Sequence, residues 1–497
     1  MEELVRSLAL FRPETALVAG LLLVVLADAT LAAWRNAAAK AITLASLLAA
    51  LVFAFQLQAA GTSASVFAGQ VVVDPLGSAF KVVLVAASLL TVLAFSFRNS
   101  KELHGLGQCE LYALVLALTF SALLLAASND LVMLYLSLEM VSITSYVMVA
   151  YLKGDRMSNE ASLKYVLFGA ASTGAMLYGL SLLYGMTGHT SIPAIQEFLA
   201  AGVTEANRFA IFAIALLVLA GFGFKIAAVP FHFWCPDVYQ GAATPVTALL
   251  SVLPKAAGLG IALRFFYGAF SSPAGGPWDL ETSLSWPGLV MLVSVVTMTV
   301  GNVAALTQTN MKRLLAYSSI AHAGYLLMGV VALSQNGARA LLVYLAAYLF
   351  MNLGAFLVVT LVHLHEGTFD LRDYPGLYRR SPLLTVAMAF FLLSLVGIPP
   401  FVGFLGKLYV FASVIEKGYG VYAFIGAVNA AIAAYYYFRV LKVMTIDAGN
   451  EDKPTLALAF ADRAWLVVFA LANLAPLVFW SAIDGWVRGS LTLYAGR

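Results

Sequence analysis

Long, uninterrupted runs of apolar residues constrain this chain more than any other feature. A helix of about 20 apolar residues spans the hydrocarbon core of a bilayer, and backbone polar groups cannot be left unpaired in lipid. We identify fourteen such segments: residues 14–34, 38–57, 77–97, 108–128, 130–151, 160–186, 207–239, 244–269, 287–308, 312–334, 338–365, 382–415, 420–445 and 460–484. The sequence therefore predicts an all-α polytopic membrane protein.

Composition excludes the other classes of protein. Hydrophobic residues make up 62% of the 497 and charged residues only 11%, against about 25% charged in a soluble domain. An outer-membrane barrel would alternate polar and apolar residues over strands of about ten residues, and the apolar runs are unbroken. The net charge of +3 gives no reason to expect a nucleic-acid partner. Cys109 and Cys235 lie in no CxxC or Cys/His cluster, so neither a disulfide nor a metal site is expected.

The spans suggest an internal repeat. The seventh and twelfth are too long for one straight crossing, and each contains proline. Each lies fourth in a block of five, and an odd number of spans inverts the second block, as in many transporters. We predict N-terminal helices 1–3 in 1–107, a first five-helix repeat (helices 4–8) in 108–269, an inverted second repeat (helices 9–13) in 287–445, and C-terminal helix 14 in 446–497.

Basic residues in the loops predict the orientation. Alternate loops carry Lys and Arg in a ratio of 15 to 8, and the richer side of a membrane protein faces the cytoplasm. Both termini are therefore predicted on the non-cytoplasmic side.

Several charged residues lie inside the predicted spans, where each costs at least about 2.5–3.5 kcal/mol. They are Glu139 in the fifth span, Lys225 in the seventh, Lys255 in the eighth and Lys407 in the twelfth. Glu139 is either a proton-binding or ion-pairing carboxylate, or a neutral carboxyl hydrogen-bonded to Ser or Thr. The lysines either face a wet interior or extend toward an interface.

Prolines next to these lysines open the helices. Pro230 follows Lys225 by five residues, and a proline cannot donate to the carbonyl four residues before it. Pro399 and Pro400 in the same way leave the carbonyls of Leu395 and Val396 without helical donors. Such carbonyls need water or a polar partner in a membrane.

Other ionisable residues carry weaker signals. Lys164 lies near the start of its span and could reach the cytoplasmic interface, and Lys81 is expected to do so. His232 and His322 fit a buried core position as well as a proton relay. Asp28 and Glu110, near span ends, are expected at the interface. We find no paired histidines for haem, no cysteine set for an iron–sulfur cluster and no nucleotide-binding loop.

The run GFGFKIAAVPFHFWCPDVYQGAATPVTALLSVLPKAAG resembles the antiporter-like membrane subunits of respiratory complex I, the bacterial NADH:quinone oxidoreductase, and most of all its subunit N branch. The similarity continues in LSLEMVSITSYVMVAY, KYVLFGAASTGAMLYG, KRLLAYSSIAHAGY and GIPPFVGFLGKLYVF. Lys407 favours this branch over the M-type, which has glutamate there. One departure is Ala243, where the family usually has proline.

The resemblance implies roles for individual residues. It implies that Glu139 is the glutamate of helix 5 and pairs with Lys225 of broken helix 7. It implies that Lys164 is a modulating lysine and Lys255 the central lysine. It implies that Lys407 is the distal lysine and that His232 is the histidine of the helix 7 motif.

The implied function is proton translocation in the membrane arm of a NADH:quinone oxidoreductase of the bacterial inner membrane. The partners would be neighbouring antiporter-like and small membrane subunits, and the lipid bilayer. No cofactor is expected in this chain, and NADH, FMN, iron–sulfur clusters and quinone are expected elsewhere in the complex. Two alternatives are a subunit of a multi-subunit Na⁺/H⁺ antiporter and a structural spacer, although a spacer would gain nothing from buried charges.

Overall fold

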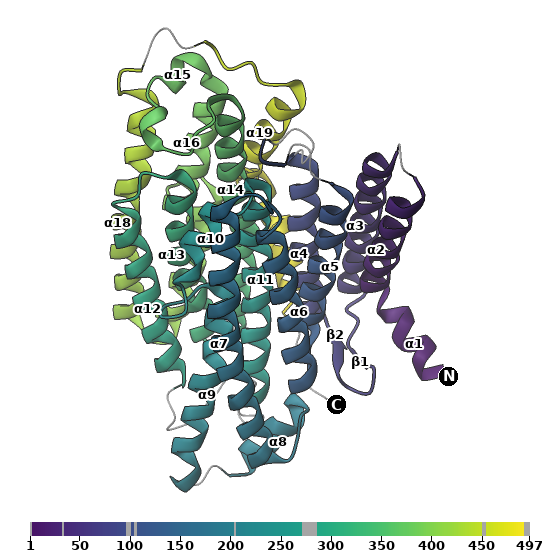
Figure 1. Ribbon diagram of the computed structural model, residues 1–497. Coiled ribbons are helices and arrows are strands. Elements are labelled where there is room, and N and C mark those ends of the chain that lie inside the picture. Colours follow the sequence, from purple (N-terminus) through teal and green to yellow (C-terminus); the bar gives the residue numbers. More distant parts are fainter. Residues whose placement is uncertain are drawn as a thin grey trace.

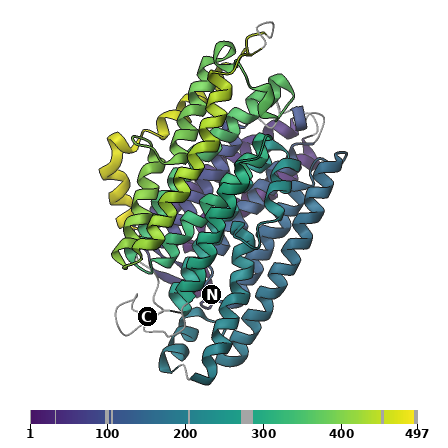
Figure 2. The same ribbon diagram turned by 90° about the vertical axis from the view of Figure 1, so that its left-hand side faces the viewer.

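The computed structural model describes residues 2–31, 34–95, 101–103, 107–202, 205–270, 286–449 and 454–491. Long helices run side by side through one bundle (Figures 1 and 2). The helices at the predicted spans are α2 (Arg12–Thr30), α3 (Arg35–Ala59), α4 (Pro75–Ala94), α5 (Cys109–Ala127), α6 (Leu131–Val149), α7 (Arg156–Thr187), α9 (Glu205–Ile226) with α10 (Trp234–Gly241), α11 (Thr244–Ala269), α12 (Trp286–Ala305), α13 (Met311–Val331), α14 (Gln335–Glu366), α16 (Pro382–Val396) with α17 (Val402–Glu416), α18 (Gly420–Thr445), and α19 (Phe460–Ala472) with α20 (Pro476–Arg488).

The polytopic helical fold class is confirmed. Within the described ranges, 12 helices are long and apolar enough to cross a membrane. The twelfth and fourteenth predicted spans are not among these 12, because each consists of two shorter helices. The break in the twelfth was expected from its prolines. The break between α19 and α20 was not, although Pro476 begins the second piece.

Shorter elements join the spans. They are α1 (Glu2–Leu10), α8 (Ile192–Ala201), α15 (Leu377–Arg380), the 3-10 turns η1 (Lys101–Leu103) and η2 (Leu371–Asp373), and the strands β1 (Ala64–Val66) and β2 (Val71–Val73). The strands form an antiparallel hairpin in which Ala64 pairs with Val73, and the sequence analysis did not predict it. Figure 1 shows the hairpin and α8 toward the lower end of the bundle and α15 at the upper end.

Burial is greatest at the centre of the bundle. The apolar window of α11 is 100% buried, and those of α13 and α14 are 94% and 83% buried. The outer helices α2 and α3 bury only about a third of their windows (33% and 28%). Lipid-facing helices can be apolar all round, whereas polar side chains must be enclosed. The central helices therefore offer the most enclosed positions for charge.

Two matching connections support the predicted inversion of the repeats. In the first, Asp130 caps α6 and accepts from the N–H groups of Val132 and Met133, and the backbone at Asp130 pairs with Ser191 after α7. In the second, Asn310 caps α13 in the same way, and its backbone pairs with Asp370 after α14. Both α7 and α14 have 32 residues. The elements that follow them, α8 and α15, lie at opposite ends of the bundle in Figure 1.

Candidate functional site in the bundle interior

Lys225 is fully buried in the last turn of α9, where the seventh span breaks. Its Nζ donates to the Oγ of Ser142 on α6 at 2.9 Å. The chain leaves α9 through Ala227, which has a left-handed φ of 60°. Near the break, the indole N–H of Trp234 donates to the carbonyl of Phe224 at 3.2 Å, and this carbonyl also accepts from the N–H of Ala227. The span therefore breaks near the proline, as predicted, and one side chain bonds the last turn of α9.

Glu139 lies on α6, three residues before Ser142, and is partly exposed on the side of the bundle. It interacts with Tyr135, and its charge acts on Lys225. Both residues are described, and no ion pair joins them. Lys225 instead uses the hydroxyl of Ser142 as its acceptor. The structure thus brings the two implied partners near each other without closing the pair.

Lys255 lies at the centre of α11 and is buried. Its Nζ donates to the carbonyl oxygen of Ser319 at 2.7 Å and to the Ser319 Oγ at 2.5 Å. The hydroxyl of Tyr348, on α14, donates to the same Oγ at 2.7 Å. Ser319 belongs to α13, so Lys255 connects the first predicted repeat to the second.

His322 lies one turn further along α13 and is also buried. Its Nδ1 is 2.9 Å from the hydroxyl of Tyr344, and its Nε2 is 3.4 Å from that of Tyr437. Its ring lies 5.2 Å from that of Tyr348. The charges of Lys255 and Lys407 both act on it. Both ring nitrogens are therefore engaged, and the ring lies within range of two lysines.

Lys407 occupies the second break, on α17, and is buried. Its Nζ donates to the carbonyls of Leu395 at 3.0 Å and Val396 at 2.7 Å. These are the two carbonyls that the prolines were predicted to free. The ammonium also lies 4.7 Å from the centre of the Tyr325 ring, a favourable cation–π contact. At Gly397, with a φ of 88°, a Cβ would come within 2.8 Å of Lys407 Cδ, so the close approach requires glycine.

These contacts define a central polar row that consists of Lys255, Ser319, Tyr348, His322, Tyr325 and Lys407. The rings of His322 and Tyr325 are 5.9 Å apart, so Lys407 meets the rest of the row through aromatic ring contacts. Ser319, Tyr348 and Tyr325 were missed by the sequence analysis. Their only sequence signal is that they are polar side chains inside apolar spans.

Lys164 lies apart from the central polar row. Its side chain is 38% exposed and pairs with Glu160 at 2.8 Å and with Asp237 of α10 at 2.7 Å. Asp237 also pairs with Arg313 of α13 at 2.5 Å. The sequence analysis missed Asp237, whose signal was an acidic residue in the second half of a broken span.

His232 is buried just before α10, but the structure does not bring it to the lysines. Its ring packs on that of Phe233 with centroids 4.5 Å apart. Its Nδ1 has no hydrogen-bond partner among the described residues. Of these two residues of the helix 7 motif, Lys225 therefore bonds to a residue of the bundle interior, whereas among the described residues His232 does not.

The expectation that Lys81 extends to the interface is wrong. Lys81, on α4, is fully buried and pairs with Glu14 of α2 at 2.7 Å. A second buried pair joins Asp74, at the start of α4, to Arg264 of α11 through two hydrogen bonds of 2.7 and 2.8 Å. The first-turn acid Glu14 was the available signal, but its partner lies 67 positions away in the sequence.

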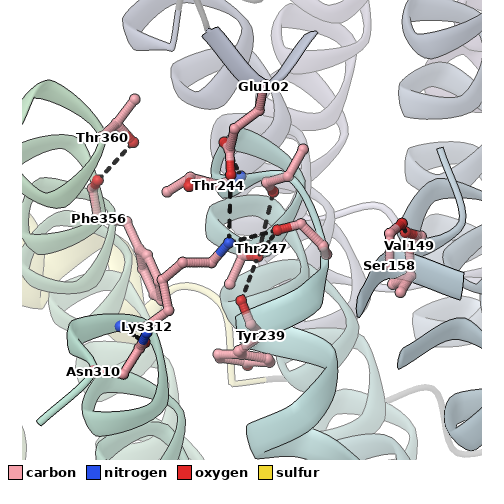
Figure 3. A network of polar contacts seen from close by, with 12 residues as sticks. Glu102, Val149, Ser158, Tyr239, Thr244, Thr247, Asn310, Lys312, Phe356 and Thr360 are labelled. Atoms are coloured by element: carbon pink, nitrogen blue, oxygen red, sulfur yellow. Dashed lines mark hydrogen bonds and ion pairs between the residues drawn. The ribbon is translucent and has the colours of Figure 1, made fainter. Parts of the chain in front are cut away.

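A polar network lies where α10 turns into α11 (Figure 3). The Nζ of Lys312 donates to the carbonyl of Ala242 at 2.6 Å and lies 3.6 Å from a carboxylate oxygen of Glu102. Glu102 accepts from the N–H of Thr244 at 2.8 Å. A cavity of about 480 Å³ reaches this network and is lined by Glu102, Gln240 and Asn310, among others. Lys312, in the first turn of α13, is thus buried and lies next to Glu102, which lines the cavity.

The network continues toward the central polar row. Thr247, also in Figure 3, donates from its hydroxyl to the carbonyl of Tyr239 at 3.1 Å. The hydroxyl of Tyr239 is 3.3 Å from Ser319 Oγ. Tyr239 therefore lies between the two regions, with its carbonyl bonded to Thr247 and its hydroxyl near the acceptor of Lys255. In the part of the chain that the structure describes, no group of three or more His, Cys, Asp or Glu could hold a metal ion.

A helical bundle with two broken spans and lysines buried beside them defines an antiporter-like membrane protein. The family model for NADH:quinone oxidoreductase/Mrp antiporter membrane proteins matches residues 128–433. Over 100% of its length the chain is 43% identical to NADH-quinone oxidoreductase subunit N of Anaeromyxobacter sp. (strain Fw109-5), of which the match covers 99%.

Solved structures share this fold. A chain of respiratory complex I from Thermus thermophilus with bound aureothin matches with a TM-score of 0.75 and 31% identity, over 94% of this chain and 98% of that one. A chain of the archaeal membrane-bound sulfane sulfur reductase matches with a TM-score of 0.85 and 23% identity, over 98% and 97%, which shows the shared fold alone. The chain belongs to the NADH:quinone oxidoreductase/Mrp antiporter family. Within it, the chain belongs with the N subunits of NADH-quinone oxidoreductase, in the membrane arm of complex I.

Proposed function

We propose that the chain translocates protons across the membrane and that quinone reduction elsewhere in the complex drives this movement. The observation that carries the proposal is the central polar row, which joins Lys255 to Lys407 inside the apolar bundle. Burying two lysines among membrane helices is costly, and intramembrane ionisable residues are retained mainly for function. A spacer would need neither lysine.

The side chains of the row suit proton transfer. Serine and tyrosine hydroxyls both donate and accept, and a neutral histidine has one donor and one acceptor nitrogen. A buried lysine is held in its charged form by its acceptors. Any movement that separates Lys255 from Ser319 would therefore favour release of a proton to the neighbouring hydroxyls.

The network of Figure 3 supports uptake of protons from one side. Glu102 lines the 480 Å³ cavity and lies 3.6 Å from Lys312, and the Tyr239 hydroxyl is 3.3 Å from Ser319 Oγ. We propose that this end faces the cytoplasm of a bacterium and that both termini face away from it. Exclusive labelling of a C-terminal cysteine from the cytoplasmic face would contradict this orientation.

We further propose that neighbouring antiporter-like and small membrane subunits flank the chain. NADH, FMN, the iron–sulfur clusters and quinone would be bound by other subunits. The chain would then receive the energy of the redox reaction as a conformational or electrostatic signal.

The test compares Lys255→Met with Lys442→Met in the complete complex. Lys255 makes two charge-assisted bonds, each worth about 1.5–3 kcal/mol, and about 1.36 kcal/mol corresponds to a tenfold change in rate. Proton pumping by Lys255→Met should fall at least about tenfold. Lys442 is 61% exposed, and its variant should pump normally. A fully assembled Lys255→Met complex with normal proton yield per NADH would overturn the proposal.

A further inference from the structure

A groove opens on the side of the bundle between α2 and α6, and α5 forms its floor. It encloses a cavity of about 670 Å³, within the range of about 300–1,000 Å³ that is common for ligand sites. α5 packs against both flanking helices. The central polar row does not line this groove, so its occupant is separate from the proposed proton transfer.

The groove is polar at one end only. Asp28 ends the groove on α2, Glu110 begins it on α5, and Lys153 follows α6. Further in, the walls are apolar, with Leu21 on α2 and Ala117 on α5. A ligand that fits must therefore combine a charged end with a hydrocarbon body.

The length of the groove distinguishes a lipid from a helix. From Asp28 to Leu21 and from Glu110 to Ala117 the lining extends over eight residues of each helix, which are seven steps of 1.5 Å or about 10 Å. One leaflet of the hydrocarbon core is about 15 Å deep, half of the roughly 30 Å total. A helix from a partner subunit would need a contact face across both leaflets, whereas an acyl chain needs only one.

The mouth of the groove is apolar. Val25 and Val147 line it and are 55% and 49% exposed. Both side chains are apolar and belong to helices on the outside of the bundle. The opening is therefore apolar and lies on the outer surface of this chain, through which an acyl chain can enter.

We propose that this groove binds one phospholipid with a zwitterionic, amine-bearing headgroup of the phosphatidylethanolamine type. The primary ammonium would donate to Asp28 and Glu110, and the phosphate would accept from Lys153. Arg35 lies 3.8 Å from Asp28, so the headgroup meets both signs of charge. An anionic headgroup without an amine would leave both carboxylates without a donor, and a quaternary choline headgroup has no N–H to donate.

The experiment counts the phospholipids that co-purify with the intact complex, by native mass spectrometry and lipid extraction. Ala117→Phe would fill the inner end of the groove, and Asp28→Asn with Glu110→Gln would remove the acceptors of the ammonium. Both variants should lose one phosphatidylethanolamine per complex. Leu23→Phe, which adds the same ring to an exposed position of α2 outside the groove, should lose none.

Three results would overturn the proposal. The phosphatidylethanolamine count could stay unchanged in both groove variants. The lost lipid could have any headgroup, which would make the groove a general lipid contact. Val25→Cys could crosslink to another subunit, which would place a protein in the groove.

Discussion

The two predicted five-span blocks, residues 108–269 and 287–445, place different side chains on similar backbones. The third helix of each block has 32 residues, and the last has 26. Each broken span turns through a left-handed residue, Ala227 in the first block and Gly397 in the second. The blocks differ in which charges these matched positions carry.

Matched positions in the two blocks can be identified by counting residues from the N-caps of α6 and α13. Nine residues after the cap Asp130 comes Glu139, and nine residues after the cap Asn310 comes Ser319. Twelve residues after Asp130 comes Ser142, the acceptor of Lys225, and the matching residue of α13 is His322. The carboxylate and hydroxyl of the first block thus correspond to a hydroxyl and an imidazole in the second.

Counting from the breaks gives a second contrast. Ten residues after Ala227 comes Asp237, and ten after Gly397 comes Lys407. Asp237 is partly exposed and pairs with Lys164 and Arg313. Lys407 is buried and donates to backbone carbonyls. The same backbone position therefore serves an outer ion-pair cluster in one block and the central polar row in the other.

The contrast teaches that the backbone sets where a polar group can sit, whereas the residue type sets which charge it holds. Lys255 of the first block donates to Ser319, the residue that corresponds to Glu139. The two blocks are therefore coupled at a position where one has a carboxylate and the other a hydroxyl. Four experiments test this comparison.

The largest effect on the amount of assembled complex is expected from a substitution outside the two blocks. Lys81→Met would leave Glu14 buried without its partner, and breaking a buried ion pair costs about 3–5 kcal/mol. The amount of assembled complex should fall sharply on native gels. The double variant Glu14→Gln with Lys81→Met should recover both assembly and proton pumping. If it assembles without pumping, the two blocks do not carry proton transfer alone.

A smaller effect is expected from making the blocks alike. Ser319→Glu places a carboxylate beside Lys255, as Glu139 is placed near Lys225. A direct ion pair should hold the proton on Lys255 and lower the initial pumping rate of assembled complex about tenfold, which corresponds to about 1.36 kcal/mol. Ser319→Ala should have less effect, because the backbone carbonyl still accepts from Lys255. Normal pumping by Ser319→Glu would show that the hydroxyl has no special role.

The matching helix caps, Asp130 of α6 and Asn310 of α13, should contribute equally to the stability of the complex. Asp130→Ala and Asn310→Ala each remove an acceptor for two backbone N–H groups, and loss of a cap costs about 1 kcal/mol. The two variants should therefore shift thermal inactivation of the complex by similar amounts. Thr144→Ala, which removes a bond within α6, is the control and should have little effect. A large shift in only one cap variant would contradict the structural match.

The smallest effect on proton pumping is expected from Glu139 and Lys225 of the first block, which are near each other but form no ion pair. Glu139 is partly exposed and not in contact with Lys225, so Glu139→Gln alone should lower pumping only a few-fold. Residues that interact show non-additivity of about 0.5–3 kcal/mol, and we expect a value near the lower limit. Glu139→Gln with Lys225→Met should thus be little worse than Lys225→Met. Fully additive losses, compared as log rates, would indicate that the two residues act independently.

Much of the fold could be predicted because it depends on local sequence. Apolar runs predicted the spans, since each span must satisfy its own backbone in lipid. The prolines near Lys407 predicted both the break and the free carbonyls, which lie only 11 and 12 residues from the lysine. The hairpin of β1 and β2 and the break before Pro476 have weaker signals, because neither interrupts a long apolar run clearly.

The sequence by itself determined that the chain crosses the membrane many times and that Lys225, Lys255 and Lys407 lie inside it. Only the tertiary structure decided which groups these lysines and their neighbours contact. Ser142 is 83 residues from Lys225, and Ser319 is 64 from Lys255. Lys81 and Lys312 also became buried only through distant partners, Glu14 and Glu102. Whether a charge can be buried depends on the acceptor that packing brings to it, and no local pattern specifies an acceptor on another helix.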